Sequence, residues 1–205
     1  TQETNTVSIT NPPAITGTTS VNGYDITVNA QGGTGTLFYS IDGIAYQGSN
    51  IFPCTPNGNY SIIIIDENQC LLTVSAEVDV EPISSTITEE PASCFGLADG
   101  SLTIQSSGGV PPYQYSLDDV TYQDEPFFEN LSAGQHSVFV KDACGFVTFY
   151  ISMIFEPTQL TASSTVLGPV ITAQGDGGMP PYQYSIDGVN FQDENDFGPL
   201  APGSY

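Results

Sequence analysis

The sequence predicts an all-β protein made of tandem antiparallel β-sandwich domains. This prediction rests on its amino-acid composition and on the frequent turn residues between short apolar stretches. Val, Ile, Tyr, Phe and Thr are plentiful whereas Ala, Leu and Lys are not, which favours pleated sheet over helix. Short apolar stretches alternate with turn residues, and the 205 residues include 21 Gly and 15 Pro. No stretch has the pattern of a long amphipathic helix.

A repeated segment sets the domain organisation. The motif Gly-Gly-x-Pro-Pro-Tyr-x-Tyr-Ser-x-Asp occupies 108–118 and 177–187, and a shorter counterpart follows Gly32-Gly33. Its second Tyr, or the equivalent one, is Tyr39, Tyr115 or Tyr184, so the repeats are offset by 76 and then 69 residues. Later aromatic and Gly positions match at the same offsets, which predicts three copies of one unit.

Pro residues after Glu or Asn mark the junctions, at Asn11-Pro12, Glu81-Pro82 and Glu156-Pro157. Because Pro removes a backbone donor, it suits a strand end or a linker. We therefore expect the last strand of a preceding repeat in 1–12, complete sandwich repeats in 13–82 and 83–157, and a partial repeat in 158–205.

Within the second repeat the alternating pattern predicts strands near 101–105, 113–117, 120–123, 136–141 and 146–153. Asp42-Gly43 and Asp187-Gly188 are hairpin signals, because Gly adopts positive φ at little cost. Asp118-Asp119 takes their place in the second repeat, so we expect backbone strain there.

The charge excludes two classes of partner. Twenty-three acidic side chains oppose one base, Lys141, for a formal charge of −22. Nucleic acid and anionic membranes would be repelled, and no apolar run approaches the length that crosses a bilayer. The acidity is typical of a surface kept soluble by repulsion.

No catalytic site is predicted. The single histidine, His136, has Tyr60 and Tyr205 as its repeat equivalents, which indicates a packing position in a sheet and not a general base. Lys141 is interpreted as a solvated charge at a strand end. The Gly-Gly pairs precede strands, whereas phosphate-binding loops lead into helices.

Two binding alternatives stay open at this stage. Calcium prefers clustered carboxylates, and two acidic loops offer them. Exposed aromatic residues would instead suit sugar stacking, although such residues more often fill a small core. The calcium candidates are Asp118, Asp119, Asp124 and Glu125, or Asp187, Asp193, Glu194 and Asp196; the aromatic candidates are Tyr113, Tyr115, Tyr122, Phe127 and Phe128.

The second repeat resembles a known family. Its motifs are Cys94-Phe95-Gly96, Asp99-Gly100-Ser101, the Gly-Gly-x-Pro-Pro-Tyr segment, Phe128-x-x-Leu131-x-x-Gly134 and Asp142-x-Cys144. Together they resemble the SprB-type repeat of very large cell-surface adhesins of Bacteroidetes, which are associated with gliding motility and type IX secretion. The resemblance implies immunoglobulin-like sandwiches in series and an extracellular location.

The resemblance also implies a disulfide between Cys94 and Cys144 in the second repeat, as a secreted β-repeat would carry. In the first repeat Cys54 and Cys70 are the only intradomain pair, although an intervening strand near 60–65 would separate them.

The sequence thus predicts a non-enzymatic adhesive stalk segment, with surface glycans or other cell-surface and secretion-machinery proteins as candidate partners. A carbohydrate-binding module, with or without calcium, is the alternative. No cofactor is expected apart from that calcium.

Overall fold

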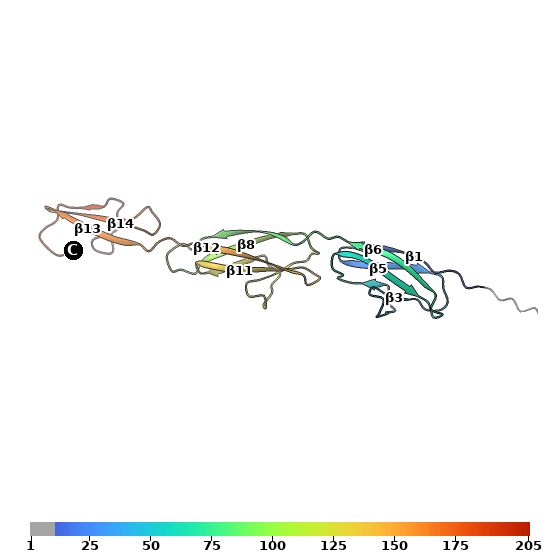
Figure 1. The fold of residues 1–205 in the computed structure, drawn as a ribbon. Helices are drawn as coiled ribbons and strands as arrows, with labels where there is room; N and C mark the ends of the chain where they lie inside the picture. The colour runs from blue at the N-terminus through green and yellow to red at the C-terminus, as the bar shows by residue number, and fades with distance from the viewer. Residues whose placement is uncertain (1–10) are drawn as a thin grey trace, which may run out of the picture. The chain divides into compact units, whose positions relative to one another are not determined.

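The protein is all-β in the computed structural model, which describes residues 11–205 (Figure 1). Fifteen strands and no helix occur in this range, so no helix within it is available to span a membrane. The strand expected in 1–12, around Val7–Ile9, lies outside the described residues.

The first repeat folds as two three-stranded antiparallel sheets facing one core. One sheet has the order β1 (Thr16–Asn22), β2 (Asp25–Gln31), β4 (Ile51–Phe52). The other has the order β3 (Phe38–Ser40), β5 (Gly58–Ile65), β6 (Leu71–Val78). Alternate residues point inward, so that Ile26 and Val28 of β2 meet Ile62 and Ile64 of β5, all fully buried.

The second repeat has the same arrangement. One sheet has the order β10 (Phe127–Leu131), β8 (Gly100–Ser107), β7 (Ser84–Glu90). The other has the order β12 (Val147–Ile154), β11 (Gly134–Lys141), β9 (Gln114–Ser116). Its buried side chains again come from both sheets, with Leu102 and Ile104 from β8 and Val138 and Val140 from β11.

The third segment contains one sheet, with the order β13 (Thr161–Leu167), β14 (Val170–Asp176), β15 (Asp196–Phe197). Phe197 is its one buried large apolar side chain among the described residues.

Most strands predicted in the second repeat are confirmed within a few residues. The strand expected at 120–123 is absent, because this stretch is a turn joined to β9 only by a bridge between Tyr115 and Gln123. Strands β7 and β10 were not predicted. The strain expected at Asp118-Asp119 is confirmed, since Asp119 has a φ of 60°.

By their contacts the residues form two compact units that cross the predicted domain bounds. Of the described residues, the first unit contains 11–84 together with the segments Ser107–Tyr113 and Lys141–Val147. The second contains Ser85–Ser106, Gln114–Val140 and Thr148–Tyr205. Every sheet nevertheless takes all its strands from one of the ranges 13–82, 83–157 and 158–205, and the three-domain division stays a prediction.

Candidate functional site

Each repeat carries an aspartate whose carboxylate closes the turn that follows the Tyr-Ser pair of the repeated motif. In the first repeat Asp42 Oδ1 accepts hydrogen bonds from Ile44 N at 2.8 Å and Ala45 N at 2.9 Å. Ser40 Oγ donates to the same oxygen at 2.9 Å. Asp118 and Asp187 receive the equivalent bonds in the other repeats. These aspartates therefore act as turn anchors.

The hydrogen bonds also keep these carboxylates ionised. Backbone donors Thr121 and Val120, helped by Ser116, lower the pKa of Asp118 to about 2. The pKa values of Asp42 and Asp187 are lowered by the same kind of contact, led by the backbone N–H of Ile44 and of Asn190 respectively.

Four of the other proposed calcium ligands accept hydrogen bonds from neutral side chains. Asp119 accepts from Tyr122 Oη at 2.5 Å, and Asp124 accepts from Gln114 Nε2 at 3.0 Å. In the third segment Asp193 accepts from Gln183 and Asp196 from Thr172. Glu125 and Glu194 offer their main-chain oxygens to Gln123 and Gln192. Among residues 11–205 these carboxylates form no group of three ligands close enough for one cation.

Two further aspartates, whose structural role was not predicted from the sequence, organise the loops at the other end of the two sandwiches. Asp66 and Asp142 are almost fully buried. Asp66 bridges two loops, accepting from Thr34 N at 2.9 Å and from Cys70 N at 2.8 Å. Desolvation opposes ionisation, but these bonds outweigh it and hold the pKa of Asp66 below its usual value. Asp66 and Asp142 are 76 residues apart, the offset between the first two repeats, and this match was the signal that could have identified them.

Asp142 does the same in the second repeat. Its Oδ2 accepts from Val110 N at 3.1 Å. Its Oδ1 accepts from Cys144 N at 2.9 Å and Phe146 N at 3.0 Å. One buried carboxylate therefore fixes the two segments, Ser107–Tyr113 and Lys141–Val147, that belong to the first compact unit.

Those two segments pack against the first sandwich at the turn between β1 and β2. A Cβ at Gly23 would lie 2.8 Å from Val110 Cγ2, so a larger residue there would have to displace that side chain. The rings of Tyr24 and Phe146 have centroids 4.6 Å apart. Burial, with a smaller contribution from the charge of Asp142, raises the pKa of Tyr24.

A disulfide joins Cys54 to Cys144 at this place, with their Cα atoms 5.2 Å apart. Asp25 Oδ1 accepts a hydrogen bond from Cys54 N at 2.9 Å and so positions the loop that carries the sulfur. Asp25, Cys54 and Cys144 are also the one triplet of metal-ligating side chains within 4.8 Å among residues 11–205. The sulfur–sulfur bond already uses two of its three ligand atoms.

Both predicted cysteine pairings are wrong, because Cys70 and Cys94 are exposed and not disulfide-bonded. Cys94 precedes β8 whereas Cys144 lies beside the residues that follow β8, and Cys54 and Cys70 stand before and after β5. An eight-residue strand is about 25 Å long, whereas bonded cysteines need Cα atoms within about 7 Å.

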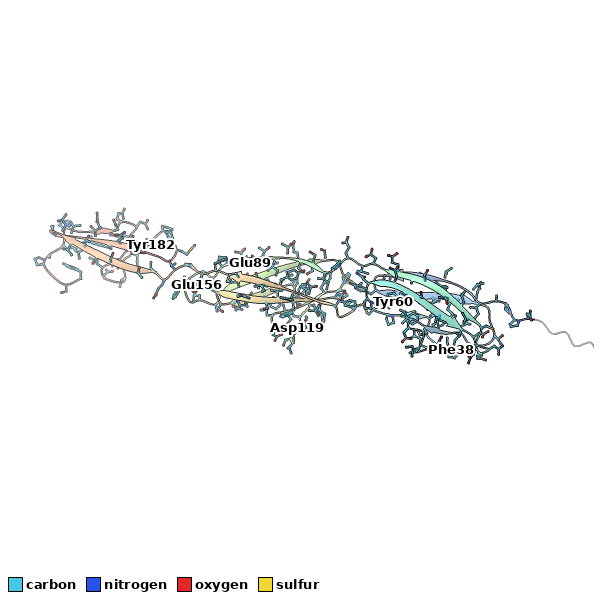
Figure 2. The ribbon with its side chains drawn as sticks, viewed as in Figure 1. Phe38, Tyr60, Glu89, Asp119, Glu156 and Tyr182 are labelled. Carbon is cyan, nitrogen blue, oxygen red and sulfur yellow. A yellow bond between two sulfur atoms is a disulfide. The ribbon has the colours of Figure 1, made fainter. Side chains whose placement is uncertain are left out.

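His136 occupies a structural position. Its Nε2 lies 2.8 Å from the carbonyl oxygen of Ser132, four residues earlier. Tyr60 Oη and Tyr205 Oη donate to the carbonyls of Pro56 and Ala201, also four residues earlier and at 2.8 Å (Figure 2 labels Tyr60). Three repeats thus use one aromatic ring position for the same contact.

The aromatic candidates do not form one common exposed group. Tyr115 is buried in the core, and Tyr113 donates to the carbonyl of Gly108, as Tyr182 does to Gly177. Tyr122 and Phe128 are half-buried, and Phe127 is exposed. Lys141 is half-buried at the end of β11.

Residues 86–121 match the family model of the SprB repeat. The chain therefore contains an SprB-type repeat, of a kind that occurs in cell-surface proteins. No curated protein matches the chain.

Proposed function

We propose that this chain is a load-bearing stalk segment of a secreted cell-surface adhesin, and that it works by mechanical reach without catalysing a reaction. The match to the SprB repeat supports a surface adhesin. The repeated pairs of sheets, each formed within its own stretch of sequence, support a serial arrangement of repeats, of which the first two are joined by a disulfide.

The side chains of the repeats support an immunoglobulin-like class of sandwich. Tyr60 stands near the start of β5 and bonds the main chain four residues earlier. Such a tyrosine corner is found in immunoglobulin-like folds at the corresponding strand. His136 replaces the tyrosine in the second repeat and keeps the contact.

The observation that carries the proposal is the disulfide between Cys54 and Cys144, which are 90 residues apart in sequence. When a chain is pulled from its ends, tension passes through a covalent cross-link and bypasses the loop that it closes. Strands β5 to β11 lie within that loop. The bond would therefore shield most of two sandwiches from load, which suits a stalk under tension.

The test is to stretch the whole chain in a single-molecule force experiment, with and without reductant. Breaking the bond frees 90 residues, which add about 300 Å of contour length at roughly 3.4 Å per residue. We expect the oxidised chain to be shorter by that amount at full extension. The variant Cys54→Ser should behave like reduced protein under both conditions.

Two results would contradict the proposal. Equal extension of the oxidised and reduced chains would mean that the bond carries no load. A single cooperative rupture of all described strands would mean that the units do not resist separately.

A further inference from the structure

The second repeat presents an apolar stripe on the outer side of strand β12. Phe149, Ile151 and Met153 alternate along the strand, and Phe155 continues the alternation beyond its end. Their exposed fractions are 63%, 62%, 43% and 71%. Phe139 of β11 adjoins the stripe, with its ring centroid 6.2 Å from that of Phe149. We call these five residues the apolar face.

The fold itself does not require this face. Repeat equivalents in and just after β6, 76 residues earlier, are Thr73, Ser75, Glu77 and Asp79, and all four are exposed. The inward residues of β12 supply the core in the usual way, since Ser152 and Ile154 are buried. The same position in the same sandwich is thus polar in one repeat and apolar in the other.

The size of the apolar face is that of a small interface. Large apolar side chains bury about 150–250 Å² when fully covered, so five of them at roughly half exposure offer about 500 Å². Two such faces packed together would bury about 1,000 Å², which is near the lower limit for a specific protein–protein interface. A weak, reversible association is therefore expected.

The distribution of charge favours a second copy of the chain as the partner that covers the apolar face. The sequences of β9, β11 and β12 contain no Asp or Glu, although the chain has 23 of them. A second copy, with a formal charge of −22, would be repelled over most of the surface and least over this sheet. A cationic partner would instead be drawn to the acidic remainder of the surface, and an anionic membrane would be repelled by it.

We propose that the apolar face docks the apolar face of a second copy of this chain, in a two-fold symmetric pair. Such an interface is self-complementary, so Phe149 of one copy lies near Met153 of the other and Ile151 lies near the axis. This inference does not depend on the stalk function, because it concerns how copies associate side by side.

The first test is sedimentation equilibrium of the whole oxidised chain, in a background where exposed Cys70 and Cys94 are replaced by Ser. Concentrations run from about 10 μM to about 1 mM, the range suited to an interface near the lower size limit. Salt at about 0.15 M limits long-range repulsion. We expect a monomer–dimer equilibrium within this range.

The matched variant gives the second repeat the side chains that the first carries at the same positions, Phe149→Thr, Ile151→Ser, Met153→Glu and Phe155→Asp. We expect it to fold, since the first repeat does so with these residues, and to weaken dimerisation at least about 30-fold, equivalent to about 2 kcal/mol. Val120→Ser removes an apolar side chain that is even more exposed but lies elsewhere in the repeat, and it should leave the equilibrium unchanged.

A cross-linking variant tests the proposed two-fold packing by the gain of a covalent dimer, and not by loss of the association. Ile151→Cys places thiols near the proposed axis, and oxidised glutathione would convert two thiols to one disulfide while being reduced to two molecules of glutathione. We expect rapid covalent dimers from Ile151→Cys and slow ones from Val120→Cys.

Several results would overturn the proposal. They are a monomer at every concentration, an equal cross-linking rate for the two cysteine variants, or a dimer that survives the four substitutions. Loss of the dimer on Val166→Ser would also overturn it, because Val166 is exposed on β13 and would place the contact on the third sheet.

Discussion

Removing the Cys54–Cys144 disulfide should destabilise the first compact unit strongly while leaving its folded structure intact. The bond closes a loop of 90 residues, and the chain-entropy relation assigns such a loop about 4 to 5 kcal/mol at 25 °C. The folded contacts around it remain available, because Val110 still covers Gly23 and Phe146 still stacks near Tyr24. The loss therefore arises in the unfolded chain, which becomes freer.

The assay compares oxidised wild type with the double variant Cys54→Ser, Cys144→Ser in urea. Hydrogen exchange at Ile62 and Ile64, which are fully buried in the first sandwich, reports the unit concerned. Replacing exposed Cys70 and Cys94 by Ser is the control and should change the unfolding free energy by less than about 0.5 kcal/mol. A loss below about 1 kcal/mol in the double variant, or an equal loss in the control, would refute the reasoning.

Three further predictions concern the loops. Gly108→Ala should lower the free energy of unfolding clearly more than Gly96→Ala does. Both glycines have φ above 70°, but only at Gly108 would the new Cβ lie 2.1 Å from the carbonyl oxygen of Pro82. Equal losses in urea titrations would contradict this. The left-handed backbone alone should cost about 1–2 kcal/mol at either position. Asp118 has a folded pKa of about 2, below its ordinary 3.8, so its stabilisation is present above pH 3.8 and is lost as the pH falls towards 2. NMR of the Asp118 side-chain carboxyl should show its titration midpoint near pH 2, and a midpoint near 3.8 would contradict the lowered pKa. Desolvation, with the Asp119 contact, raises the pKa of Tyr122 from 10.0 to about 12. The stabilisation of the folded state by protonated Tyr122 is therefore present below pH 10 and is lost as the pH rises towards 12. In Asp119→Asn the phenolate absorbance should appear at lower pH than in wild type, and an unmoved midpoint would contradict the role of Asp119.

The repeat pattern was sufficient to predict the fold class and most strands of the second repeat, because period-two alternation reports directly which side chains face a core. It also predicted that His136 is a packing residue from its Tyr60 equivalent, and the shared contact to the carbonyl four residues earlier agrees with that. Strands β7 and β10 were missed. In β10, Phe127–Leu131 does not alternate cleanly and its pairing with β8 is interrupted.

The disulfide could not be predicted from one repeat at a time. Pairing within a repeat assumes that a cysteine must find its partner in its own sandwich, but β5 and β8 each separate the expected partners by a strand length. The bond forms instead because Lys141–Val147, held by buried Asp142, belongs to the unit that contains Cys54. That placement depends on tertiary packing, which composition and spacing do not report.

The covalent ring closed by Cys54 and Cys144 has a consequence for how the chain responds to proteolysis. Exposed loops are the usual places where proteases cut, and several lie between these two cysteines. A single cut anywhere in that interval opens the ring without dividing the molecule, because the sulfur–sulfur bond still joins the two fragments. A nicked chain of this kind would stay in one piece until it was cut again outside the ring or met a reductant.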